Sequence, residues 1–107
     1  MAFYIKQNDT SPAIETILQS DDGSVIIDLT DCEVNFHMTH SQRDVEITGA
    51  CEILDEVGGR VRYQWLAGDT SVSGWYRAEF QVTYSDAKIE TFPNDGSIWI
   101  HVDGELA

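Results

Sequence analysis

Basic residues are scarce in this sequence: Lys and Arg together number 6 against 19 Asp and Glu, which gives a formal net charge of −13. Such an acidic surface repels phosphate backbones and anionic lipid headgroups, so we expect no direct binding to nucleic acid or to a membrane surface. Two interpretations of the acidity stay open. One is a basic protein partner or bound cations, and the other is a solubilising or salt-adapted surface, which we favour.

Long apolar runs are also missing. No segment approaches the roughly 18 consecutive apolar residues of a transmembrane helix. Residues 1–7 lack the basic start and the long apolar stretch of a signal peptide. With 42% hydrophobic and 10% aromatic residues, the chain can nevertheless build a packed core. We therefore expect one domain over residues 1–107, made in the cytoplasm.

Helical periodicity is nearly absent as well. Short alternating apolar and polar runs, separated by turn residues such as Asp21-Asp22-Gly23, are typical of an all-β sandwich or barrel. About seven to nine strands in this length predict an immunoglobulin-like antiparallel β-sandwich. Residues 25–27 are expected to form a short strand, and residues 68–73 at most a helical turn. The predicted inward-facing residues are Ile14, Leu18, Val34, Phe36, Ile47, Val61, Tyr63, Trp65, Tyr76, Phe80, Val82, Ile98 and Ile100.

Two cysteines fall on neighbouring strands of one predicted hairpin. A turn centred on Ser41-Gln42 would place the following residues opposite one another: Met38 and Val45, Phe36 and Ile47, Cys32 and Cys51. Directly opposite cysteines lie near the separation that a disulfide permits. A cytoplasmic origin instead favours free thiols, which pack as small apolar groups. Both states of Cys32 and Cys51 stay open, and we favour the free thiols.

Groups that perform bond-making chemistry are sparse. The spacing of His37 and His40 points them to opposite faces of a strand, and neither these nor His101 has a zinc-site spacing, so we expect surface histidines. Carboxylate pairs such as Asp21-Asp22 fall at strand ends without the pattern of a calcium loop. Neither a nucleophile elbow nor a phosphate-binding loop is present. We therefore expect no enzymatic activity, no cofactor and no metal site.

Three aromatic residues are expected to point outward: Tyr4, Trp75 and Trp99. In the alternating pattern, the two tryptophans lie on the faces opposite Tyr76 and Ile98. Exposed Trp residues often anchor protein interfaces, so these three are the candidate partner-binding residues. Alternatively, the alternation slips or another segment covers the rings. A further alternative is a sugar-stacking platform, which requires at least two of the rings to be coplanar, exposed and neighbouring.

Tyr76 follows Gly74 at the start of a late strand. In immunoglobulin-like folds, a tyrosine at such a position hydrogen-bonds back to an upstream loop, an arrangement called the tyrosine corner. The loop over residues 67–73 would supply the acceptor here. The alternative is that Tyr76 is an ordinary core residue with its hydroxyl at the rim.

A series of short motifs runs through the chain in a fixed order. They are Asp9-Thr10-Ser11-Pro12-x-Ile14-x-x-x-Leu18, Asp21-Asp22-Gly23, Ile27-Asp28-Leu29-Thr30, Val34-x-Phe36-x-Met38, Gly59-x-Val61-x-Tyr63-x-Trp65, Gly68-Asp69-Thr70, Gly74-x-Tyr76-x-Ala78-Glu79-Phe80-x-Val82-Thr83 and Thr91-Phe92-Pro93. Each is only a strand with a turn, whereas their order and spacing together are specific. Over residues 3–102 the chain resembles the N-terminal domain of the phage upper baseplate (BppU-type) family.

The resemblance implies a non-enzymatic structural protein of a tailed-phage virion, acting as a docking or adaptor module of the tail or baseplate. Its implied partners are other virion structural proteins in multiple symmetric copies. The sequence ends at Ala107, so we expect no stalk or fibre to follow. This departure from the baseplate members keeps capsid decoration and head–tail joining as alternatives. A carbohydrate-binding β-sandwich is the alternative from another class.

Overall fold

The computed structural model describes residues 2–106. Within these residues the chain forms strands and turns and no helix, so no helix is present that is long and apolar enough to cross a membrane. The strands are β1 (Ala2–Lys6), β2 (Ile14–Ile17), β3 (Glu33–His40), β4 (Glu46–Ala50), β5 (Glu52–Asp55), β6 (Arg60–Tyr63), β7 (Gly74–Thr83), β8 (Ile89–Phe92) and β9 (Ile98–Asp103).

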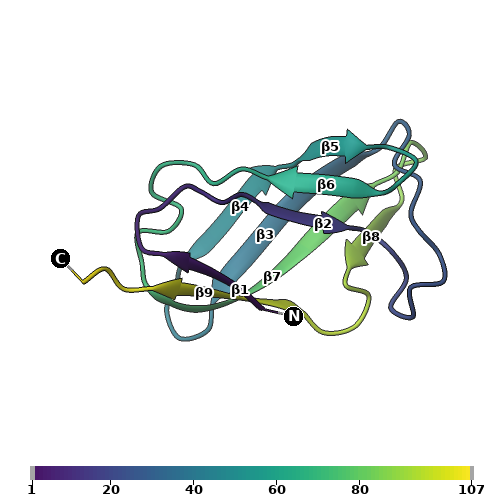
Figure 1. Ribbon diagram of the computed structural model, residues 1–107. Helices are drawn as coiled ribbons and strands as arrows, with labels where there is room; N and C mark the ends of the chain where they lie inside the picture. Colours follow the sequence, from purple (N-terminus) through teal and green to yellow (C-terminus); the bar gives the residue numbers. More distant parts are fainter. Residues whose placement is uncertain (1, 107) are drawn as a thin grey trace.

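The strands form two sheets that pack face to face (Figure 1). The large sheet has the order β1-β9-β7-β3-β4, and the small sheet has the order β2-β6-β5. The first half of β7 pairs with β9 and its second half with β8, so β8 and β9 follow one another along the same side of β7. The predicted all-β sandwich is confirmed. One pair departs from the antiparallel prediction, because β1 and β9 run parallel.

Aromatic rings from both sheets meet in the core. Phe36 of β3 stacks on Tyr63 of β6 with ring centroids 4.5 Å apart, and it contacts Phe80 of β7 edge-on at 5.3 Å. Complete burial of such a side chain stabilises the fold by roughly 1.5–3 kcal/mol. The predicted core residues are buried with one exception, because Ile47 is only partly buried.

The predicted register of β3 and β4 is wrong by two residues. Met38 faces Ile47, and Phe36 faces Gly49. The cause is a longer loop after β3, in which Nδ1 of His40 accepts hydrogen bonds from the backbone N–H groups of Gln42 and Arg43, both at 3.0 Å. This side-chain acceptor stabilises a wider loop than the turn that the sequence suggested.

The cysteines are consequently not opposite one another. The N–H of Cys51 donates to the carbonyl of Val34 at 2.9 Å, and both Cys32 and Cys51 are free thiols. Cys51 is also the point at which the chain passes from β4 in the large sheet directly to β5 in the small sheet. We call this the closed side of the sandwich (Figure 1).

The opposite side is less complete. There β2 is the edge of the small sheet, and β1 and β8 are edges of the large one. Among the described residues, no strand on this side joins the two sheets directly. The strand expected at residues 25–27 is wrong, because that segment makes only a single bridge, between Gln19 and Ile26. We call this region, between β2 and the β8–β9 connection, the open side.

The loop between β6 and β7 is held by two tyrosines. The hydroxyl of Tyr76 donates to the carbonyl of Val72 at 2.6 Å, which is the contact expected of a tyrosine corner. The hydroxyl of Tyr63 donates to the carboxylate of Asp69 at 2.6 Å, and burial together with this bond raises the pKa of Tyr63. Residues 67–70 form turns rather than a helix.

Candidate functional site

The register of the large sheet brings the predicted outward aromatic residues together. Tyr4 of β1 lies opposite His101 of β9, and Trp75 of β7 lies opposite the same histidine from the other side. Residues directly opposite one another share a face of the sheet, and Trp99 precedes His101 by two positions on that face. We refer to Tyr4, Trp75, Trp99 and His101 as the aromatic patch.

The rings of the patch pack against one another while staying accessible. Trp75 stacks on His101 with centroids 4.4 Å apart, and it contacts Trp99 at 6.2 Å and Tyr4 at 6.0 Å. Tyr4 is 64% exposed, Trp75 40% and Trp99 42%. The outward orientation predicted for the tryptophans is therefore confirmed. Their role in binding a partner stays a prediction.

The geometry does not meet the condition for a sugar-stacking platform. The ring planes of Trp75 and Trp99 are inclined by 81°, and those of Tyr4 and Trp75 by 75°. Both contacting pairs among the three predicted rings are therefore close to perpendicular. A pyranose face requires a flat aromatic surface, which these rings do not present together.

Charged residues border the patch. Lys6 and Asp103 form an exposed ion pair at 2.8 Å, two residues along the β1–β9 ladder from Tyr4 and His101. The hydrogen bond and the charge of Lys6 lower the pKa of Asp103. Arg77 lies opposite Trp99.

Beside Tyr4 the surface forms a groove of about 290 Å³. It is lined by Tyr4, Ile5, Lys6, Asp9, Ser11, Pro12, His101 and Asp103.

The three histidines occupy different environments. His37 and His40 point to opposite faces of β3, as predicted. His40 is buried, 9% exposed, and packs edge-on against Tyr76, so the expectation of a surface histidine is wrong there. The burial of His40 was not predicted, because it depends on hydrogen bonds to the following loop, which the alternation of apolar and polar residues does not reveal. Nδ1 of His37 lies 2.8 Å from the Thr48 hydroxyl, while His101 belongs to the aromatic patch.

Neither cysteine is activated. Burial raises the pKa of the Cys51 thiol to about 12. Burial, with the nearby charges of Asp28 and Asp31, also raises the pKa of Cys32. A thiol reacts as its thiolate, so both shifts disfavour nucleophilic chemistry. Within residues 2–106, no group of three or more His, Cys, Asp or Glu side chains is placed to hold a metal ion.

The fold defines a β-sandwich module with an aromatic surface on one sheet. The BppU N-terminal domain family matches residues 3–92, which is most of the sequence, and the chain belongs to this family. Membership makes it a phage baseplate structural domain, and so a virion component associated with other virion proteins. No curated protein matches the chain.

Proposed function

We propose that this chain is a non-enzymatic docking or adaptor module of the phage tail or baseplate, and that it contacts other virion structural proteins through the aromatic patch. The observation that carries the proposal is the meeting of Tyr4, Trp75 and Trp99 on one outer face. The chain acts as one domain, made in the host cytoplasm and incorporated in multiple symmetric copies. Its acidity supports a role without nucleic acid.

The packing of the patch suits it to binding. The rings already contact one another on a hydrogen-bonded sheet, so little side-chain freedom is lost when a partner covers them. Trp and Tyr are also the residues that most often dominate interface energies. In a symmetric particle many copies engage together, so avidity makes a modest contact per copy sufficient.

The alternatives receive less support. Family membership favours the baseplate over capsid decoration or head–tail joining. The nearly perpendicular rings disfavour a carbohydrate platform. A protein partner does not require coplanar rings, because its side chains can pack into the spaces between inclined rings.

The test is the double variant Trp75→Ala with Trp99→Ala, introduced into the phage. Loss of an interface anchor commonly costs about 2 kcal/mol or more, so we expect incorporation into purified particles to fall roughly thirtyfold. Circular dichroism and thermal unfolding of the isolated double variant should show the same fold.

The matched control replaces two exposed apolar residues outside the patch, Val57→Ala with Leu66→Ala. This control should incorporate normally. Particles that lack the protein altogether would contradict the virion role. Normal incorporation of the Trp double variant would instead contradict the role of the patch alone.

A further inference from the structure

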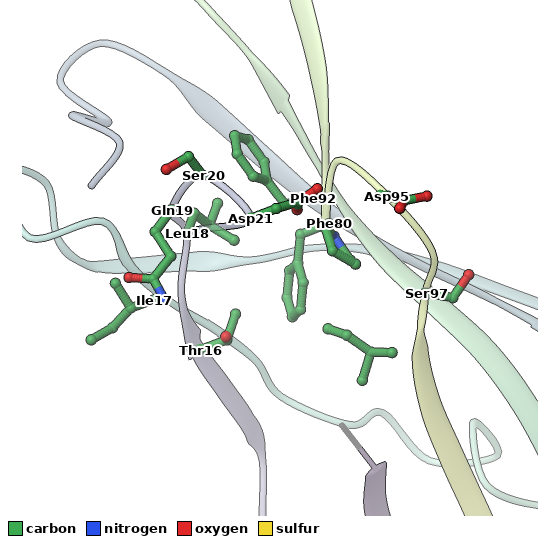
Figure 2. A pocket seen from close by; sticks show the side chains of 12 residues that line it. Thr16, Ile17, Leu18, Gln19, Ser20, Asp21, Phe80, Phe92, Asp95 and Ser97 are labelled. Atoms are coloured by element: carbon green, nitrogen blue, oxygen red, sulfur yellow. The ribbon is translucent and has the colours of Figure 1, made fainter. Parts of the chain in front are cut away.

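A second surface lies on the open side of the sandwich, away from the aromatic patch. It is a cleft of about 460 Å³ between β2 and the β8–β9 connection (Figure 2). One wall is the continuous segment from Thr16 to Asp21. The other wall carries Pro93, Asp95 and Ser97, with Phe80, Phe92 and Ile98 at its base.

Within residues 2–106, the first wall presents an unpaired strand edge. The N–H of Leu18 donates to the carbonyl of Gly59 at 2.8 Å, and the carbonyl of Leu18 accepts from Ile27 at 3.0 Å, both on the β6 side. Backbone groups in a strand alternate in direction. The N–H and C=O groups of Ile17 and Gln19 therefore point away from β6, toward the cleft.

The floor of the cleft is apolar. Leu18, Phe80, Phe92 and Ile98 are between 0 and 7% exposed. The last three lie where β7 changes partner from β9 to β8. Figure 2 shows the Phe80 and Phe92 side chains between the β2 segment and the loop that carries Asp95 and Ser97. A cleft with unpaired backbone on one wall and apolar rings at its base fits an extended chain better than a compact ligand.

The rim is acidic. Asp21 and Asp95 are both exposed at the cleft, and the described residues that line it include no Lys or Arg. Asp21 also ties the two walls together, because its carboxylate accepts a hydrogen bond from the N–H of Asn94 at 3.1 Å. A basic side chain on the occupant would be complementary to this charge. A second copy of this chain, with a net charge of −13, would not.

We propose that the cleft binds an extended segment of another virion protein, which adds as a strand to the free edge of β2 and of its continuation to Gln19. The segment hydrogen-bonds to Ile17 and Gln19, places an apolar side chain over Phe80 and Phe92, and carries a Lys or Arg that pairs with Asp21 or Asp95. Its length matches the wall from Thr16 to Asp21, about six residues at the ordinary rise of a strand. The proposal rests on the proposed function, since the partner is a virion protein.

Hydrogen–deuterium exchange tests strand addition directly. In the free protein the amides of Ile17 and Gln19 should exchange rapidly, whereas the amide of Leu18 is already protected by Gly59. In purified particles we expect the Ile17 and Gln19 amides to slow by at least about tenfold, as expected for a newly formed backbone hydrogen bond. Unchanged rapid exchange in particles that contain the protein would overturn the proposal while leaving the proposed function standing.

A proline variant gives a second, independent test. Ile17→Pro removes the N–H that faces the cleft and keeps the β6 ladder, a position where edge strands tolerate proline. The control Ile17→Thr keeps the N–H and a β-branched side chain. We expect the proline variant to incorporate about tenfold less than the threonine variant, with equal folding of both by circular dichroism.

Three outcomes count against the proposal. Equal incorporation of the two Ile17 variants would overturn it. Self-association of the purified protein in light scattering, abolished by Ile17→Pro, would replace the partner with a second copy and also overturn it. Absence of the protein from particles would overturn both this inference and the proposed function, which separates that failure from the others.

Discussion

The closed and open sides of the sandwich differ in how the edges of the two sheets meet. On the closed side the chain crosses from β4 to β5 at Cys51, so backbone continuity joins the two sheets. On the open side, β2 is short and ends beside a cleft. The core between the sides is shared, so the difference concerns only their edges. A closed side adds stability, whereas an open side keeps backbone hydrogen-bonding groups available to a partner.

The largest expected effect concerns the access of solvent and reagents to Cys51 on the closed side. The pKa of the Cys51 thiol is raised by burial from 9.0 to about 12, which corresponds to a roughly thousandfold smaller thiolate fraction at mildly alkaline pH. We expect iodoacetamide to modify Cys51 at least about thirtyfold more slowly than an unfolded thiol, because the greater nucleophilicity of a high-pKa thiolate offsets part of its lower abundance. Mass spectrometry of digested protein over time measures the rate, with urea-unfolded protein as control. Equal rates in the folded and unfolded protein would show that this side is open too.

The next effect tests the packing beneath that crossing. A Cβ atom at Gly49 would lie 2.6 Å from Cε1 of Tyr63. Tyr63 has little room to move, since it stacks on Phe36 and donates to Asp69. We expect Gly49→Ala to lower the free energy of unfolding by about 1–3 kcal/mol, measured by urea denaturation.

Gly104→Ala is the matched control, because a Cβ atom there meets nothing within 4 Å. Its effect should stay within about 0.5 kcal/mol. If the two alanine variants were equally stable, Tyr63 would have to be more mobile than its contacts indicate.

The smallest effect concerns the turn beside the open side. The carboxylate of Asp22 accepts hydrogen bonds from the hydroxyl and N–H of Ser24 and from the hydroxyl of Ser20, which lower its pKa from 3.8 to about 2. A lowered pKa contributes stability that is complete above pH 3.8 and is lost as the pH falls through about 2. We expect Asp22→Asn to make the unfolding temperature less dependent on pH in this range.

The control for this turn is Asp44→Asn, an exposed carboxylate in the loop after β3. The difference between the two variants in pH dependence then isolates the contribution of the hydrogen bonds that the Asp22 carboxylate accepts. An NMR titration that finds an ordinary pKa for Asp22 would remove the basis of the prediction.

The fold could be predicted because strand alternation is local. The period of two in β3 and β7 identified their buried faces, and hence most of the core, correctly. The β3–β4 register could not be predicted, because the side chain of His40 sets the loop length. The parallel pairing of β1 with β9 was not predicted, because the two strands are far apart in the sequence and no short turn connects them.

The site was predictable in its parts and not in its arrangement. Alternation alone showed that Trp75 and Trp99 point outward. Only the strand order places Tyr4 beside them, and only the ladder places His101 against Trp75. The cleft was missed entirely, since its walls come from residues 16–21 and 80–98, which no local pattern connects.

The parallel pairing of β1 and β9 has a mechanical consequence. Ala2 lies beside Trp99 at one end of this ladder, and Lys6 lies beside Asp103 at the other. A force that pulls Ala2 and Asp103 apart therefore acts along the strands and loads the hydrogen bonds of the ladder together, in shear. An antiparallel pair held at the same end would open one bond at a time. The β1–β9 pair therefore meets such a pull with its whole ladder and not with the outermost hydrogen bond alone.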